Sequence, residues 1–337
     1  MNPFKKRIPS VFSIETPFQA LCAIAAIKQL EIEDYKFLVF FPPYEARNAQ
    51  LRIVLKDFGI KYKEIKPFNR ITFRLAKWLA LKKHRTHYNR LFIGDFRDIN
   101  LYYTSLRFVT DGADVVYLDD GSVTISLLKD IINEPMEKDA ISFLKEVEYK
   151  RSIVSNKNFL TIYDKIENPK YRTMLLDLCL IRPQLHNERK NSGIFIVGTN
   201  IDRYCAPLEI SNDVYIAKLD ELIRKLKRDY PDEQVVFIPH GRDKSEYAKV
   251  ICERYGASFE PSETTIELKL LDLQSSPKVV YGFTSSALYN IKKMFPHTEV
   301  VNIVYECEKS TPFFQEYLTI SNYYLQNGIE LLMEPLQ

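Results

Sequence analysis

The chain has 337 residues, of which 46% are hydrophobic and 27% charged, a balance that is typical of a globular protein of about two domains. Its 47 basic and 44 acidic residues give a net charge of +3, which is too even to indicate a nucleic-acid partner. The five cysteines show no CxxC spacing, and the chain has neither a secretory signal nor a long apolar run. We therefore expect a cytoplasmic protein with free thiols and no membrane span.

Short apolar runs alternate with helical patterns in the first part of the chain. Continuous apolar strands between helices predict a parallel sheet covered on both faces. From about 135 to 188 the charges are mixed, and only 152–154 reads as a strand. The elements that we expect before that stretch are strands at 11–14, 37–41, 62–65, 91–93 and 115–118, and helices at 17–30 and 46–58.

A second α/β series begins near residue 193. Two such series in succession predict two Rossmann-like domains, which we place at 1–188 and 189–337. Pro183 and polar residues interrupt the pattern at this boundary. The second series has expected strands at 193–197, 235–238, 278–281 and 300–304, and expected helices at 213–228, 244–255, 266–273 and 285–294.

An acidic motif, Asp119-Asp120-Gly121-Ser122, follows the expected strand at 115–118. Ligands of doubly wound sheets bind at the carboxyl ends of the strands. Adjacent carboxylates at such a place suit a general base or a divalent metal. An Asp-Gly turn that merely ends the strand explains the same residues.

Two further motifs end strands of the second series. Pro239-His240-Gly241-Arg242 follows 235–238, and the arginine side chain could bind a phosphate bidentately. A packed loop histidine is the plainer alternative. Thr284-Ser285-Ser286 precedes a helix, where hydroxyls and backbone N–H groups form an anion site or an ordinary helix N-cap.

In this order, the three motifs resemble those of bacterial sialyltransferases, which share an acidic-acidic-Gly, a His-Pro and a Ser/Thr-rich motif. The chain resembles in particular glycosyltransferase family 52, the lipooligosaccharide sialyltransferases, and next the bacterial polysialyltransferases. The likeness covers most of the chain, including Thr16-Pro17-Phe18-Gln19 and Gly198-Thr199-Asn200-Ile201-Asp202. Gly241 departs from the pattern, because the family has proline after the motif histidine. The resemblance implies an α/β fold of the GT-B type, with two Rossmann-like domains facing a central cleft.

The resemblance also implies an activity, the inverting, metal-independent transfer of sialic acid from CMP-Neu5Ac. The acceptor would be a terminal sugar, galactose above all, of a bacterial lipopolysaccharide, lipooligosaccharide, O-antigen or capsule. His240 would stabilise the departing phosphate. The likeness to polysialyltransferases points to Asp119 or Asp120 as the base, and that to family 52 points to Asp202. The other implied contacts are Pro239, Arg242, Thr284, Ser285 and Ser286 to CMP, Glu267 to its ribose, and Thr16 and Gln19 to the acceptor.

Other interpretations remain open. One is another CMP-releasing transferase, for a different nonulosonic acid, Kdo or glycerophosphate; another is a non-catalytic GT-B-like sugar-binding protein; a third uses the acidic pair for a metal. We expect no cofactor, and a homodimer is left open. One group of basic residues is either a solvated helix face or a surface for anionic lipid at the inner face of the cytoplasmic membrane. This group comprises Lys5, Lys6, Arg7, Lys77, Lys82, Lys83, His84, Arg85 and His87.

Overall fold

The computed structural model divides the chain into two compact units, Met1–Ile181 (unit 1) and Arg182–Gln337 (unit 2). The predicted boundary after residue 188 lies outside the described residues. These are 4–65, 86–96, 98–122, 124–125, 157–163, 171–181, 193–241, 243, 246–261, 263–272, 276–305 and 312–334. In this part of the chain each unit is a parallel sheet with helices, as the sequence predicts.

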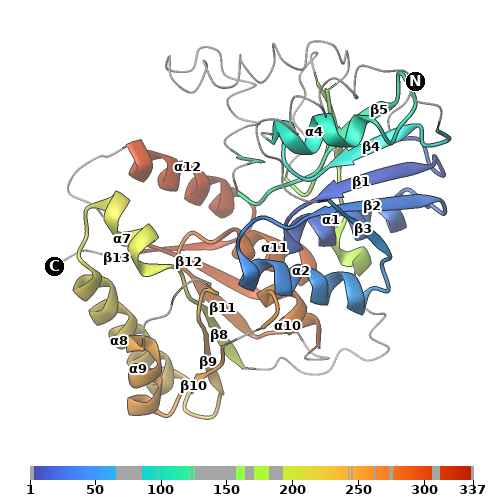
Figure 1. Cartoon of the computed structure of the whole chain (residues 1–337). Helices are drawn as coiled ribbons and strands as arrows, with labels where there is room; N and C mark the ends of the chain where they lie inside the picture. Colours follow the sequence, from blue (N-terminus) through green and yellow to red (C-terminus); the bar gives the residue numbers. More distant parts are fainter. Residues whose placement is uncertain are drawn as a thin grey trace. The chain divides into compact units, whose positions relative to one another are not determined.

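The described residues of unit 1 form a seven-stranded parallel sheet in the order β3-β2-β1-β4-β5-β6-β7 (Figure 1). Strand β1 is therefore an interior strand between β2 and β4, and the chain reverses its direction of travel across the sheet between β1 and β4. The strands are β1 (Ser10–Ile14), β2 (Tyr35–Phe40), β3 (Tyr62–Ile65), β4 (Arg90–Ile93), β5 (Asp114–Tyr117), β6 (Lys157–Thr161) and β7 (Tyr171–Leu175). The helices are α1 (Pro17–Gln29), α2 (Glu45–Asp57), α4 (Ile99–Leu106) and the 3-10 turn η1 (Leu178–Ile181).

The central strands of unit 1 are held by aromatic packing. The ring of Phe12 on β1 stacks on Phe37 of β2 and Phe92 of β4, with centroids 5.1 and 4.5 Å apart. All five residues of β1 are buried, including the two serines Ser10 and Ser13, as expected for an interior strand of a parallel sheet. The rigid strand leads directly into the polar loop that precedes α1.

Strands β6 and β7 correct the expectation of an irregular stretch from 135 to 188. They extend the sheet beyond β5, whereas the strand expected at 152–154 lies outside the described residues. On β7, Arg172 and Leu175 are exposed and the residues between them half-buried. A partly solvated strand of this kind lacks the continuous apolar run by which strands such as β8 and β9 were found.

Unit 2 has a six-stranded parallel sheet among its described residues, in the order β10-β9-β8-β11-β12-β13. Its first strand, β8, is again an interior strand. The strands are β8 (Ile194–Val197), β9 (Val235–Ile238), β10 (Ser258–Phe259), β11 (Val279–Gly282), β12 (Glu299–Tyr305) and β13 (Glu330–Glu334). The helices are α7 (Ile201–Leu208), α8 (Asn212–Asp229), α9 (Tyr247–Tyr255), α10 (Ile266–Asp272), α11 (Ser286–Met294) and α12 (Pro312–Gln326).

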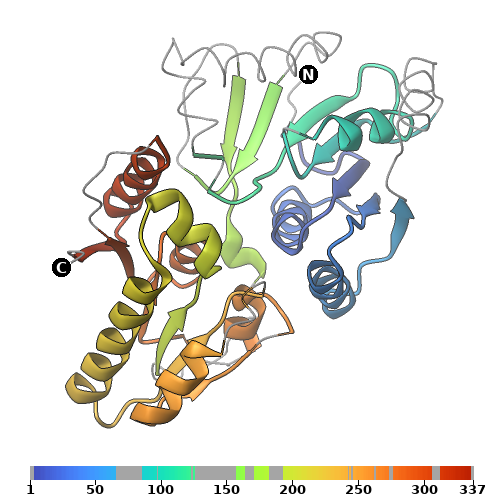
Figure 2. The same cartoon turned by 60° about the vertical axis from the view of Figure 1, so that its left-hand side comes forward.

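The core of unit 2 is rich in aromatic rings. Tyr204 of α7, Tyr215 of α8, Phe283 after β11 and Tyr305 of β12 contact one another with centroids 4.9–6.3 Å apart. Helices α8 and α9 pack side by side (Figure 2, yellow and orange). Because Phe283 packs in this cluster, the cluster anchors the start of the loop that follows β11.

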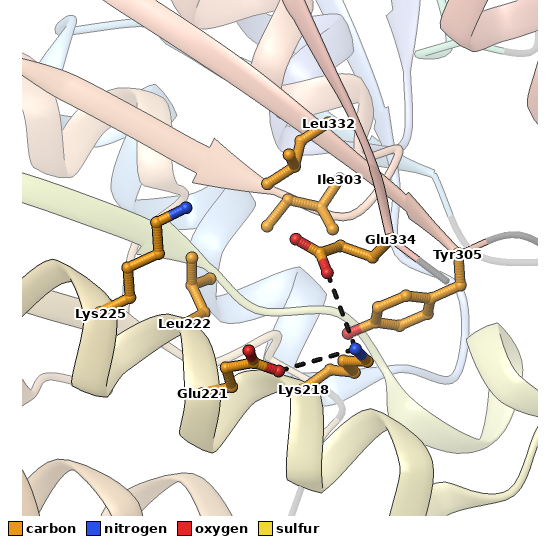
Figure 3. A pocket seen from close by; sticks show the side chains of 8 residues that line it. All are labelled: Lys218, Glu221, Leu222, Lys225, Ile303, Tyr305, Leu332 and Glu334. Atoms are coloured by element: carbon orange, nitrogen blue, oxygen red, sulfur yellow. Dashed lines mark ion pairs between the residues drawn. The ribbon is translucent and has the colours of Figure 1, made fainter. Parts of the chain in front are cut away.

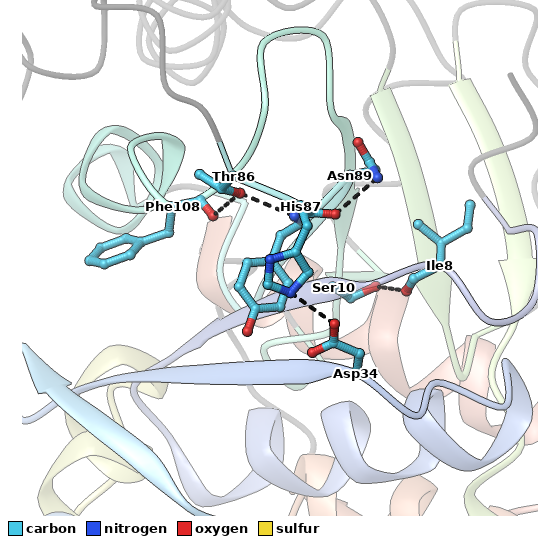
Figure 4. Close-up of polar contacts among 8 residues, drawn as sticks. Ile8, Ser10, Asp34, Thr86, His87, Asn89 and Phe108 are labelled. Carbon is cyan, nitrogen blue, oxygen red and sulfur yellow. Dashed lines mark hydrogen bonds and ion pairs between the residues drawn. The ribbon is translucent and has the colours of Figure 1, made fainter.

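The basic residues of the sequence are only partly described. Lys6 and Arg7 pair with Glu31, and His87 Nε2 lies 2.8 Å from Asp34 Oδ2 (Figure 4). The residues at 77–85 lie outside the described part of the chain. Among the described helices, none has the length and apolar character needed to cross a bilayer.

Candidate functional site

In unit 1, the loops after β1, β4 and β5 end three neighbouring strands of a parallel sheet. Their residues therefore gather at the carboxyl edge, on either side of the point where the strand order reverses. The acidic motif follows β5, and the loop from Glu15 to Thr16 follows β1. The usual location of a ligand in this fold thus coincides with the predicted acidic residues.

The two motif aspartates of unit 1 have different surroundings. Asp119 is only 1% exposed and accepts hydrogen bonds from the Thr161 hydroxyl and the Ile162 N–H, both at 2.7 Å. Burial raises the pKa of Asp119 to about 7, although these hydrogen bonds oppose the shift. Asp120 is half-buried. Asp119 therefore joins the β5 loop to the end of β6, and Asp120 is the motif carboxylate that remains accessible.

Gln19, on the first turn of α1, brings two loops of unit 1 together. Its side chain is fully buried. Nε2 donates to Asp120 Oδ1 at 2.8 Å, and Oε1 accepts from the Glu15 N–H at 2.8 Å. The predicted acceptor contact does not fit a side chain with no exposed surface. Thr16, the other predicted acceptor residue, is half-buried and caps α1 by accepting from the Gln19 N–H.

The sequence analysis missed a group of charged residues at this edge of unit 1. Glu15 directly follows β1, and its pKa is raised to about 7 by burial first and then by the nearby Asp98. Asp95 and Asp120 act in the same direction, and the Arg47 cation opposes them. Each acidic residue stands alone in the sequence, so no motif marked them. The available signal was their position directly after β1 and β4.

In unit 2, two motifs flank the central strand β8. Pro239 and His240 follow β9, and Thr284 to Ser286 follow β11. The sheet thus brings both motifs to one edge, beside the loop after β8. Pro239 is half-buried and His240 is exposed, whereas Arg242 lies outside the described residues.

The serine motif combines a helix cap with a strained residue. Ser285 caps α11 by accepting from the Ala287 N–H at 3.3 Å. Thr284 has φ +46°, a conformation that is costly for a β-branched side chain. Its N–H donates to Asn302 Oδ1 at 2.7 Å, while its buried hydroxyl has no hydrogen-bond partner among the described residues. Thr284 thus places a buried hydroxyl directly before the N-terminus of α11.

The two other predicted site residues of unit 2 accept hydrogen bonds from side chains of the same unit. Glu267 of α10 is 5% exposed and accepts from Asn290 Nδ2 of α11 at 2.8 Å. Asp202 is exposed in the first turn of α7, where the helix dipole favours a carboxylate. It accepts from Asn212 Nδ2 at 3.1 Å. The ribose contact of Glu267 and the base role of Asp202 stay predictions.

Two further features concern ligands. Among the described residues, no three His, Cys, Asp or Glu side chains are grouped so that they could hold a metal ion. A small pocket between α8, β12 and β13 contains the ion pairs of Lys218 with Glu221 and Glu334, at 3.6 and 3.7 Å (Figure 3). None of the predicted site residues lines this pocket.

No protein-family model matches the sequence, and no curated protein sequence does. Solved structures do. The GT-B domain of a sialyltransferase from Photobacterium damselae is 14% identical, with a TM-score of 0.50 over 97% of this chain and 99% of that one. A 2,6-sialyltransferase from Photobacterium sp. JT-ISH-224, in complex with CMP and lactose, is 14% identical, with a TM-score of 0.51 over 96% and 78%.

A third similar structure is that of a protein assigned as a UDP-N-acetylglucosamine 2-epimerase from Listeria monocytogenes. It is 12% identical, with a TM-score of 0.51 over 88% of this chain and 79% of that one. These likenesses, together with the two parallel α/β units, show that the chain has a fold of the GT-B type. At these identities they concern the fold alone.

Proposed function

We propose that this chain is an inverting sialyltransferase, which moves sialic acid from CMP-sialic acid to a hydroxyl of a sugar acceptor. The observation that carries the proposal is the position of the three motifs. The acidic motif ends β5 in unit 1, and the histidine and serine motifs end the strands on either side of β8 in unit 2. The known structure with CMP and lactose has this fold, which supports a CMP-linked donor and a galactose-containing acceptor.

In the proposed reaction, the two motifs of unit 2 bind the CMP-sialic acid donor. The phosphate of CMP would bind at the N-terminus of α11, where backbone N–H groups favour an anion. The half-buried Ser286 hydroxyl is suited to donate to it, whereas the Thr284 hydroxyl is buried and has no hydrogen-bond partner among the described residues. His240 would stabilise the negative charge that develops as CMP departs. Its exposure leaves the imidazole accessible to such a ligand.

Asp120 is the general base in the proposed reaction. Inversion at C2 requires a group that accepts the acceptor hydroxyl proton as the new bond forms. Asp119 is buried and bound by two donors, so it is poorly placed to touch an acceptor. Asp120 is half-buried beside it. Asp202 is the alternative base, and the variants below distinguish the two.

The test is a transfer assay with CMP-Neu5Ac and a panel of galactosides that includes lactose, with product detection by mass spectrometry. We expect a sialylated product whose formation falls roughly 100–10,000-fold in Asp120→Asn and in His240→Ala. Asp57→Asn, which changes an exposed aspartate at the end of α2, is the matched control and should keep wild-type turnover.

The competing functions give different results in the same assay. Transfer from another CMP-linked nonulosonic acid, from CMP-Kdo or from a CMP-linked glycerol phosphate, with none from CMP-Neu5Ac, would assign a different donor. Interconversion of UDP-GlcNAc and UDP-ManNAc would indicate an epimerase. Binding of CMP without any turnover would indicate a sugar-binding protein. Transfer that is lost in Asp202→Asn but kept in Asp120→Asn would reassign the base.

A further inference from the structure

The side-chain amide of Gln19 is the only polar group that the buried face of α1 presents in its first two turns, where its described neighbours are Pro17, Ala20, Leu21, Cys22 and Ala23. A buried amide costs stability unless it is hydrogen-bonded. Both of these side-chain hydrogen bonds involve loops at the carboxyl edge of the sheet, from Nε2 to Asp120 and from the Glu15 N–H to Oε1. A leucine at this position would fill similar space without the free-energy cost of burying an amide. Packing alone therefore does not explain the glutamine.

Gly94, the first residue after β4, leaves the space that Gln19 occupies. A Cβ atom at this position would lie 2.2 Å from Gln19 Oε1 and 2.4 Å from its Cδ. The Gly94 backbone has no positive φ, so its conformation alone would accept another residue. Close approach of the glutamine therefore requires the glycine, and the residues from β1, β4 and β5 form one arrangement.

Charges of both signs surround this arrangement. The pKa of Glu15 is raised by Asp98, Asp95 and Asp120 and lowered by the Arg47 cation, so Asp120 lies close to at least one like charge, that of Glu15. A donor that binds the charged form of a carboxyl group favours that form. The Gln19 N–H also fixes the direction of the Asp120 carboxylate.

We propose that Gln19, seated on Gly94, is a positioning residue that keeps the Asp120 carboxylate oriented and ionised as the proton acceptor. The inference rests on the function proposed above and adds to it a residue that acts through Asp120 and does not touch the substrate. It predicts a change in pH dependence, which a purely structural role would not produce.

The first experiment measures kcat/KM against pH for Gln19→Leu. We expect the acid limb of the profile to move to higher pH by about one unit, since one such shift corresponds to the loss of about one hydrogen bond to a charged group. Activity should recover at high pH. Asn158→Leu is the matched control, because it removes another buried amide, which donates to the Val115 carbonyl at 2.8 Å. Its acid limb should stay in place.

A second pair of variants tests whether Gly94 acts through the Gln19 side chain. Gly94→Ala should displace Gln19 and move the acid limb in the same direction, although Gln19 itself is unchanged. In a Gln19→Ala background the added methyl group has room, so Gly94→Ala should cause no further shift. Additive shifts, or a fall in kcat of equal size at every pH, would overturn the proposal.

A third measurement does not depend on the activity. The carboxyl carbon of Asp120 can be followed by NMR in protein labelled with 13C-aspartate, and its signal identified by its loss in Asp120→Asn. Its titration midpoint should move to higher pH in Gln19→Leu and stay fixed in Asn158→Leu. A shift without any transferase activity would contradict the proposed function alone. An unmoved midpoint in an active enzyme would contradict the role of Gln19 alone.

Discussion

The Thr161 hydroxyl and the Asp119 carboxylate are joined by a hydrogen bond of 2.7 Å between the end of β6 and the loop after β5. Asp119 precedes Asp120 in the chain, so this bond fixes the backbone from which the accessible carboxylate projects. Support for the proposed base thus comes from a strand that the sequence did not reveal.

Thr161→Val should lower the free energy of unfolding more at pH 8 than at pH 5. The pKa of Asp119 is about 7, so the carboxylate is mostly charged at pH 8, where a lost hydrogen bond costs about 2 kcal/mol. At pH 5 it is mostly protonated and the cost is smaller. Urea unfolding at both pH values measures the difference. An equal loss of stability at the two pH values would mean that the hydroxyl binds the charged and the protonated carboxyl group of Asp119 equally well.

Glu15→Gln should reduce the loss of stability on raising the pH. The pKa of Glu15 is raised from 4.5 to about 7 in the folded protein. Between these values the folded chain binds a proton that the unfolded chain has released, so the free energy of unfolding falls as the pH rises. Glutamine cannot titrate. Between pH 5 and pH 8 the variant should therefore lose less stability than wild type, by about 1 kcal/mol after allowance for partial exposure.

Chemical denaturation at those two pH values tests the Glu15 prediction. Glu33→Gln, a change at an exposed position, should keep the wild-type dependence. A Glu15→Gln curve parallel to that of wild type would show that Glu15 does not carry the effect.

Thr284→Val should leave the fold as stable as wild type or more so, because it removes an orphan buried hydroxyl and keeps the shape. If that hydroxyl binds the donor phosphate, KM for CMP-sialic acid should rise. Ser285→Ala provides the contrast, since loss of the α11 cap costs about 1 kcal/mol of stability. Thermal unfolding and donor titration distinguish the two. An unchanged KM in Thr284→Val would remove this hydroxyl from the donor site.

Transfer should survive treatment with EDTA. In the proposed mechanism His240, the Ser286 hydroxyl and the α11 N-terminus compensate the charge of the leaving phosphate. The measurement is turnover with and without chelator, followed by dialysis. Activity that is lost completely and restored by Mg²⁺ or Mn²⁺ would make the acidic pair a metal site.

The two successive α/β series, together with the resemblance to bacterial sialyltransferases, predicted the GT-B fold class, and apolar runs predicted most strands. Val235–Ile238 was predicted with its observed bounds. The same method overlooked β13 and β7, which lie at sheet edges and are partly solvated. Burial does not decide every case, because the method found the mostly exposed edge strand β3 and missed β6, whose described side chains are buried.

The candidate site was predictable only as far as neighbours in the chain could show it. Asp119 and Asp120 are adjacent, and so the motif was visible, but their different burial depends on Thr161 and Gln19, which are 42 and 101 residues away respectively. The role of Gly94 becomes evident only when the Gln19 side chain that packs against it is known. Such relations arise from strand order, which the sequence alone does not reveal.

The interior position of β1 has a consequence for how the chain is made. Strand β1 gains its second neighbour only when β4, at residues 90–93, has been synthesised. Thr161 and Ile162, which hold Asp119, follow later still. Because domains generally fold as units during synthesis, a nascent chain that ends between β5 and β6 carries the acidic loop without its support. The carboxyl edge of unit 1, with its acidic loop, is therefore completed late in that unit's synthesis, well after its hydrophobic centre.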